Sequence, residues 1–300
     1  MPKPGTLGKL IAEYRASPSF TDLKPRTQSD YQQCFDFLKP IADTPLIRFD
    51  SPLIVRIRDK AAAKHGRRRG NYVKAVLSIV FAWGAERGYL NRNPAASVKN
   101  IRRRRDAPEA NRPWSDVERH AVWDAMPAHM QPAIALMMYC GLDPQDALAL
   151  PRSAIKDGHI DTRRGKTAEP VWLPLPSIVV ESIAAAPKHD AVTVCATSRG
   201  TVWTVSGFRA SWRPIRQSLE AAGAVNKGLT LKGLRHTVAT ILAEIGFNNR
   251  AIADLLGQRT EAMAAHYSRR ADRTKKNTAT VASFEEEVNR RRTKIVKPAD

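Results

Sequence analysis

Apolar residues recur at helical spacing in two stretches within the first 98 residues of the chain. Positions three and four apart fall on one face of a helix, so such a series predicts an amphipathic helix that packs by its apolar face. The two clearest series are Leu7, Leu10, Ile11 and Tyr14, and Tyr72, Val73, Val76, Leu77, Val80, Phe81 and Trp83. Residues 1–98 are therefore predicted to form a small all-helical domain.

Two helices of this domain have recognisable starting signals. Thr27 is expected to cap a helix over residues 28–38, and Ser51 to cap one over residues 52–64. Pro52 would occupy the first helical position of the second helix, where a missing N–H costs nothing.

The helical pattern is lost between Asn91 and Asn111, where the sequence contains Asn-Pro and Ala-Pro. Such dipeptides are typical of connecting segments. We assign residues 99–112 as an interdomain linker and residues 113–300 as a second domain.

The second domain begins with further helix signals. The run Trp114-Ser115-Asp116-Val117-Glu118 is typical of a capped helix start, and helices are expected to continue to about Tyr139. Asp143 and Pro144 then predict the N-cap and first position of a short helix.

Extended and helical patterns alternate in the rest of this domain. Residues 155–175 read as short strands, with Lys166 in a hairpin, and the helical pattern returns from Ser206 onward. A charged final helix carries an apolar stripe of Val281, Phe284 and Val288. The expected fold class is mainly α with a small antiparallel β-sheet: an all-helical domain, then an α+β domain.

The chain is strongly basic, with a net charge of +20 and a pI near 10.3. Because neutralised phosphates release counterions, this charge predicts a polyanionic partner, and double-stranded DNA is the first candidate. A membrane surface is the rival partner, but the sequence lacks an 18-residue apolar run, a signal peptide and a lipidation motif. We expect a cytoplasmic, nucleoid-associated protein that binds no membrane.

Two arginine clusters are candidate phosphate contacts. They consist of Arg67, Arg68 and Arg69, and of Arg102, Arg103, Arg104 and Arg105. The first precedes the helix that contains Tyr72 and is interpreted as a clamp loop, the alternative being a solvated charged loop. The second lies in the linker and would suit a strap across a phosphate backbone, the alternative being a nuclear-localisation signal.

Cys34, Cys140 and Cys195 are widely spaced and odd in number, and neither they nor the histidines show metal-ligand spacing. We therefore predict structural cysteines and no metal site.

The strongest functional signal is a spaced series of motifs in the last third of the chain. It comprises Leu231-Lys232-Gly233-Leu234-Arg235-His236-Thr237, then Leu256-Gly257-Gln258, then His266-Tyr267-Ser268. Tyr267 follows Arg235 by 32 positions, Lys232 lies three before Arg235, and Gln258 lies nine before Tyr267. This arrangement, like the layout of nearly the whole chain, resembles the tyrosine recombinase (phage integrase) family. The resemblance implies a SAM-like core-binding domain, a basic linker and a catalytic domain.

Phosphodiester chemistry calls for these residue types. When a tyrosine oxygen attacks phosphorus, negative charge grows on the non-bridging oxygens, and a guanidinium such as Arg235 can hold two of them. Tyr267 would be the nucleophile, and its 3′-phosphotyrosyl bond would preserve the energy for rejoining, so no cofactor is expected. The resemblance implies that Lys166 protonates the 5′-hydroxyl leaving group. The alternative for Lys166 is a solvated lysine in a turn. The alternative for Tyr267 is a core residue of an amphipathic helix.

Three positions depart from the family pattern. Lys232 stands where histidine is most common, and Gln258 stands where histidine or tryptophan is common. Asp143 occupies the place of the first catalytic arginine, and loss of such a donor costs roughly 100- to 1,000-fold in rate. Arg152 or Arg164 is the nearest candidate to compensate for it.

His236 follows Arg235 directly in the sequence. We expect it to be a buried framework residue rather than an acid or base.

The leading interpretation is a site-specific DNA recombinase, such as the integrase of a mobile element, that acts as a homotetramer on paired sites with a possible DNA-bending accessory protein. The alternative is a DNA-binding descendant that cleaves poorly because of Asp143 and serves as an accessory or regulatory factor. A type IB topoisomerase would share the tyrosine chemistry but matches the layout less well.

Overall fold

In the computed structural model, which describes residues 2–104, 106, 110–165, 167–267, 271 and 274–296, the chain divides into two units. These are Met1–Ala107 and Pro108–Asp300. The first unit contains helices α1 (Leu7–Ala16), α2 (Pro18–Thr21), α3 (Pro25–Leu38), α4 (Ser51–His65) and α5 (Arg67–Glu86), with short 3-10 turns η1 (Lys39–Ile41) and η2 (Leu46–Arg48). The all-helical prediction for this region is confirmed, and the apolar series of α1 and α5 meet in one core.

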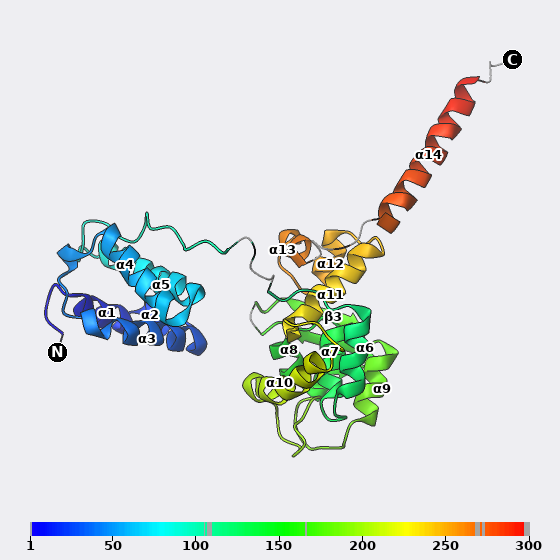
Figure 1. The fold of residues 1–300 in the computed structure, drawn as a ribbon, viewed down its shortest axis with the longest axis horizontal. Coiled ribbons are helices and arrows are strands. Elements are labelled where there is room, and N and C mark those ends of the chain that lie inside the picture. The colour runs from blue at the N-terminus through cyan, green and yellow to red at the C-terminus, as the bar shows by residue number, and fades with distance from the viewer. Residues whose placement is uncertain are drawn as a thin grey trace. The chain divides into compact units, whose positions relative to one another are not determined.

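The helices α4 and α5 form a tightly packed hairpin (Figure 1). Gly66 joins them with φ of +85°, a left-handed conformation that favours glycine. A Cβ on Gly70 would lie 2.6 Å from the carbonyl oxygen of Arg58, so only glycine lets the two backbones approach this closely. Because α5 begins directly after Gly66, Arg67, Arg68 and Arg69 form its first turn. The prediction of an arginine loop ahead of a helix that starts at Tyr72 was therefore wrong.

Two predicted caps in this unit were also wrong. Helix α3 begins at Pro25 after Lys24, so Thr27 lies inside its first turn. Helix α4 is capped by Asp50, whose carboxylate accepts a 2.7 Å hydrogen bond from the Leu53 N–H. The Ser51 hydroxyl instead bonds the Pro94 carbonyl at 3.0 Å, which ties the start of α4 to the segment after α5.

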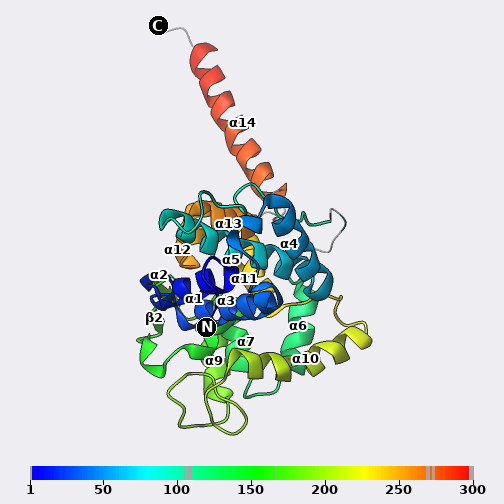
Figure 2. The ribbon, with the colours of Figure 1, turned by 90° about the vertical axis from the view of Figure 1, so that its left-hand side faces the viewer.

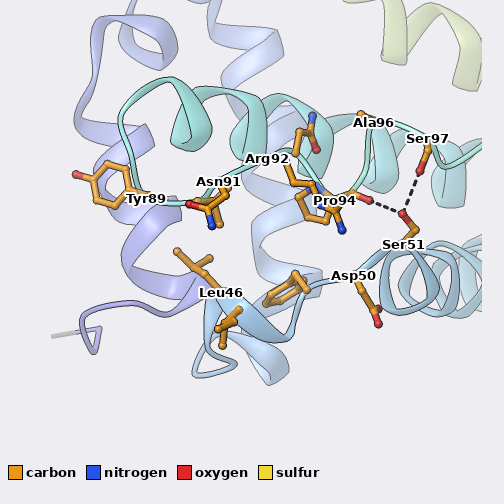
Figure 3. Close-up of a pocket in the computed structure, with 13 residues that line it drawn as sticks. Leu46, Asp50, Ser51, Tyr89, Asn91, Arg92, Pro94, Ala96 and Ser97 are labelled. Carbon is orange, nitrogen blue, oxygen red and sulfur yellow. Dashed lines mark hydrogen bonds between the residues drawn. The ribbon is translucent and has the colours of Figure 1, made fainter.

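A surface hollow of about 790 Å³ lies beside this tie, between η2, the start of α4 and residues 89–97 (Figure 3). Dashed lines in the figure mark the bonds from Ser51 to Pro94 and Ser97. None of the predicted site residues lines this hollow.

The second unit mixes helices with a small sheet. Its elements are α6 (Asp116–Ala125), α7 (Gln131–Tyr139), α8 (Pro144–Ala149), η3 (Arg152–Ala154), β1 (Ile155–Lys156), β2 (His159–Arg163), β3 (Pro170–Pro174), α9 (Ser177–Ala185), α10 (Val205–Ala221), α11 (Leu231–Glu244), α12 (Asn249–Leu255), α13 (Glu261–Tyr267) and α14 (Thr274–Val296). The sheet has the order β1-β2-β3 with antiparallel neighbours. The predicted mainly α fold with a small antiparallel sheet is confirmed.

Helix α7 is apolar on nearly all sides and forms the centre of this unit, packed against α9 and α11. Both views place α11, α12 and α13 at one end of the unit and α9 and α10 towards the other (Figures 1 and 2). Helix α13 packs on α11 and α12 through a small separate cluster that includes Val238, Leu256 and Ala264.

The predicted capped start of α6 is confirmed, and the cap is a capping box. The Ser115 hydroxyl accepts from the Glu118 N–H, and the Glu118 carboxylate accepts from the Ser115 N–H. Glu118 is only 2% exposed and also forms an ion pair with Arg112, with 2.6 Å between Nη2 and Oε1. Burial alone would raise the pKa of this carboxyl, but bonds from Arg112 and from the N–H groups of Ser115 and Asn226 outweigh burial and lower it to about 2.

All three cysteines are buried, as the sequence predicted. Burial raises the pKa of the Cys34 thiol to about 11 and those of Cys140 and Cys195 to about 12, so these thiols stay protonated at neutral pH. No helix in the described part of the chain is long and apolar enough to cross a membrane.

Candidate active site

Arg235 is fixed inside the second unit by two backbone carbonyls. Helix α11 starts at Leu231, where the Thr230 hydroxyl caps it, and its buried face carries Arg235 into the interior with 7% exposure. The guanidinium donates from Nη1 to Gly141 O at 2.8 Å and from Nη2 to Leu256 O at 2.6 Å. These acceptors come from the turn before α8 and the end of α12, so Arg235 fixes three segments relative to one another.

Gly141 has the backbone conformation that this arrangement needs. Its φ is +61°, and a Cβ there would lie 2.5 Å from Cδ2 of Leu256. Any larger residue would clash with the side chain of Leu256, the residue whose carbonyl is the second acceptor of Arg235.

Tyr267 is the last residue of α13 and is half-buried. The Arg235 guanidinium carbon lies 5.7 Å from the centroid of the Tyr267 ring, so α11 and α13 bring the two predicted residues together. The ring of His236 lies 4.2 Å from the Tyr267 ring, centroid to centroid. The prediction of a buried framework role for His236 needs correction, because its side chain is half-buried and packs directly on Tyr267.

Gln258 follows α12 and is 8% exposed. Neither its amide nitrogen nor its amide oxygen has a hydrogen-bond partner among the described residues. Buried amides are normally hydrogen-bonded, so an unpartnered pair of amide atoms is unusual.

Lys232 lies one turn before Arg235 on α11 and is half-exposed. Its ammonium nitrogen is 3.7 Å from Oδ2 of Asp143. Asp143 is the predicted N-cap of α8, since Oδ1 accepts the Gln145 N–H at 3.4 Å. The carboxylate of Asp143 is therefore paired with Lys232.

Arg164 reaches the same interior from the end of β2. It is 6% exposed, its Nη1 lies 2.8 Å from Oδ2 of Asp146, and its Nη2 donates to Leu256 O, the carbonyl that also binds Arg235. Asp146 is held in turn by the Gly165 N–H at 3.1 Å from Oδ1. The other arginine named from the sequence, Arg152, points elsewhere: it donates to Ala191 O at 3.1 Å and His189 O at 2.6 Å.

Lys166, the predicted general acid, lies outside the described residues. The hairpin around it is described on both sides, with Arg164 N–H bonded to Glu169 O at 2.8 Å and Ala168 N–H bonded to Arg164 O at 2.8 Å.

The predicted DNA-contacting arginines lie in the first unit. Arg67 donates from Nη1 to Ile101 O at 3.3 Å, and Asn71 bonds both the N–H and the carbonyl of Ile101. These contacts fasten the beginning of the predicted linker to α5. Arg68 and the described linker arginines Arg102, Arg103 and Arg104 are exposed, whereas Arg105 lies outside the described residues.

The sequence profile of the phage integrase family matches residues 116–274, which include every predicted catalytic residue. The chain belongs to the phage integrase family. A search of curated proteins gave no match. The described residues contain no group of three or more His, Cys, Asp or Glu side chains that could hold a metal ion.

Solved structures share the fold. A lambda integrase (75-356) dimer bound to a COC' core site is 18% identical, with 88% of this chain and 95% of that chain covered and a TM-score of 0.75. A lambda integrase tetramer bound to a Holliday junction is 18% identical, with coverage of 89% and 79% and a TM-score of 0.74. The Tn1549 transposon integrase in complex with transposon right end DNA is 15% identical, with coverage of 94% and 99% and a TM-score of 0.72.

Proposed function

We propose that this protein is a site-specific DNA recombinase that cuts and rejoins double-stranded DNA through Tyr267, as the integrase of a mobile element. The observation that carries the proposal is the position of Tyr267 beside Arg235, with a guanidinium carbon 5.7 Å from the ring. These two residues lie in the region matched by the family profile.

In the proposed reaction the Tyr267 oxygen bonds to phosphorus while the bond from phosphorus to the 5′-oxygen breaks. Tyr267 loses its hydroxyl proton, and the 5′-oxygen gains one, for which Lys166 is the proposed donor. Arg235 would bind the non-bridging oxygens as their charge grows, and it is already aligned by its two carbonyl bonds. Gln258 would offer its unpartnered amide N–H to the same phosphate.

Binding to DNA would rest on exposed arginines of the first unit. Arg68 and the exposed arginines of the linker would contact phosphates, and a nucleoid location would follow from such binding. Arg67 would act less directly, because its guanidinium holds the linker at Ile101.

Assembly into a homotetramer on paired sites is part of the proposal. Val281 and Phe284 on α14 are 60% and 67% exposed, an apolar stripe that would suit a neighbouring protomer. A DNA-bending accessory protein is a further possible partner in such an assembly.

The experiment that tests the proposal is covalent trapping on DNA. The binding site is first selected from random DNA, and a nick is then placed near the cleavage position so that the short 5′-hydroxyl fragment diffuses away. A covalent adduct with the wild-type protein that disappears in Tyr267→Phe is the expected result. Tight, specific binding without any adduct would contradict the proposal.

A DNA-binding descendant with impaired cleavage is the second candidate. The pairing of Asp143 with Lys232 favours it, because a carboxylate near the phosphate would repel it and offset a cation. This candidate predicts specific binding, no adduct in the wild-type protein, and an adduct in Asp143→Arg.

A further inference from the structure

Two buried guanidinium groups converge on one carbonyl oxygen in the second unit. Arg235 and Arg164 are 7% and 6% exposed, and each donates from Nη2 to Leu256 O. Within the described part of the chain, Asp146 is the carboxylate that lies within 4 Å of Arg164, and none lies within that distance of Arg235. Two buried cations with one partly buried anion leave a net positive charge, which is costly unless a second anion binds.

Unsatisfied polar atoms occur on Arg164 itself and on Gln258, which follows Leu256 by two residues. The Nε of Arg164 is buried and has no hydrogen-bond partner among the described residues, and the same holds for both amide atoms of Gln258. Gly257, which precedes Gln258 in the chain, lies close to Arg164, since a Cβ on it would be 3.1 Å from Arg164 Nε. Moreover, each terminal nitrogen of a guanidinium carries two N–H groups, so both arginines keep donors beyond those used on carbonyls and on Asp146.

A phosphodiester fits these requirements. Its non-bridging oxygens would bring the missing negative charge and accept the remaining N–H groups of two planar guanidinium forks. Arg164 is aligned for this by the bond to Leu256 O and by the ion pair with Asp146, whose second oxygen is fixed by the Gly165 N–H.

We infer that Arg164, from the end of β2, supplies the second guanidinium that binds the scissile phosphate, in place of the arginine absent at Asp143. In this inference, which rests on the proposed function, Arg164 is a catalytic residue. Asp146 is a positioning residue that holds Arg164 by its charge. Arg152 has no part, because its guanidinium is bonded to the backbone of residues 189 and 191.

The test compares Arg164→Lys and Arg164→Met with the matched variants Arg152→Lys and Arg152→Met. The rate of adduct formation is measured in single turnover on nicked cognate DNA with a normal scissile phosphate. Arg164→Lys keeps the ion pair with Asp146 but loses the fork, and we expect it to be ~10- to 100-fold slower than wild type. For Arg164→Met we expect adduct formation to be ~100- to 1,000-fold slower than wild type. Both Arg152 variants should react near the wild-type rate.

A second substrate separates phosphate binding from a structural role. It carries an uncharged methylphosphonate at the scissile position, so the transition state has one negative charge and one non-bridging oxygen fewer for Arg164 to bind. The defect of Arg164→Met should then shrink to about tenfold or less, whereas a misplaced active site would be equally slow on both substrates. Thermal unfolding and DNA affinity of each variant are recorded, and if Arg164→Met does not fold, Arg164→Lys is compared on the two substrates instead.

The outcomes are distinct. A folded Arg164→Lys with the wild-type rate, or a defect that is the same on both substrates, would overturn the inference and leave the proposed function standing. Absence of any adduct from the wild-type protein would overturn the proposed function, and the inference with it.

Discussion

The ammonium group of Lys232 lies 3.7 Å from the carboxylate of Asp143, which joins the first turn of α11 to the start of α8. Both side chains are partly exposed, so the ion pair itself contributes little to stability. The N-cap bond of Asp143 to the Gln145 N–H matters more for the fold. The carboxylate at 143 therefore has a structural reason to be there that is separate from any catalytic effect.

Asp143→Asn separates these two roles, because asparagine caps a helix about as well as aspartate but carries no charge. We expect the free energy of unfolding to change by less than about 0.5 kcal/mol, while adduct formation on nicked DNA rises severalfold as Lys232 is released. Asp143→Ala, the control without a cap, should lose about 1 kcal/mol of stability. Chemical denaturation and the adduct assay measure the two effects, and a slower Asp143→Asn would show that the negative charge assists cleavage.

Gln258→Met should lower the activity without lowering the stability of the protein. Methionine has a similar size but no polar atoms, so it removes two buried groups that lack partners in the free protein. We expect the free energy of unfolding to stay unchanged or to rise by about 1 kcal/mol. Adduct formation should fall ~10- to 100-fold, since the amide donor to the phosphate is lost. A clear loss of stability would mean instead that the Gln258 amide is bonded in solution, for example to water.

Local signals predicted much of this fold. The capping box of Ser115 and Glu118 and the cap at Asp143 were predictable because each depends on residues within three positions along the chain. The hairpin around residue 166 follows from short apolar alternation. In contrast, the start of α5 at Arg67 was missed, because a run of three arginines shows no apolar periodicity although Gly66 permits an abrupt turn.

Contacts between distant segments were harder to predict from the sequence. From the sequence we expected Asp143 to stand in the place of an arginine, and proximity along the chain gave both Arg152 and Arg164 as candidates to compensate for it. The choice between them depends on Asp146 and on the carbonyl of Leu256, which lies 92 residues beyond Arg164. The contact of His236 with Tyr267 similarly depends on the packing of α13 against α11, which no local pattern encodes.

Gly257→Ala should disturb the candidate active site by straining the backbone at residue 257 and displacing Arg164. Gly257 has φ of +57°, and a Cβ there would lie 2.8 Å from Val171 Cγ2 and 3.1 Å from Arg164 Nε. The left-handed conformation and the crowding together should cost about 1–3 kcal/mol of stability. Adduct formation should fall further than this loss explains, because Arg164 is displaced. Gly228→Ala serves as a control, since its φ of +90° imposes similar strain with nothing within 4 Å of the added Cβ; equal activity losses in the two variants would contradict the role of Gly257.

The buried carboxylate of Glu118 should make the second unit sensitive to acid. Its pKa is about 2 in the folded protein, below the ordinary value of 4.5, because Arg112 and two backbone N–H groups stabilise the charged form. A lowered pKa means that this stabilisation is fully present above pH 4.5 and is lost as the pH falls towards 2. The shift corresponds to about 3 kcal/mol at most. Glu118→Gln should lower the stability at pH 7 and flatten its pH dependence between 4.5 and 2, as measured by denaturation at a series of pH values. The exposed Glu86, which pairs with Arg87 on the surface, provides the control: Glu86→Gln should leave the dependence of stability on pH unchanged. If Glu118→Gln loses stability in acid as steeply as wild type, the responsible carboxylate lies elsewhere.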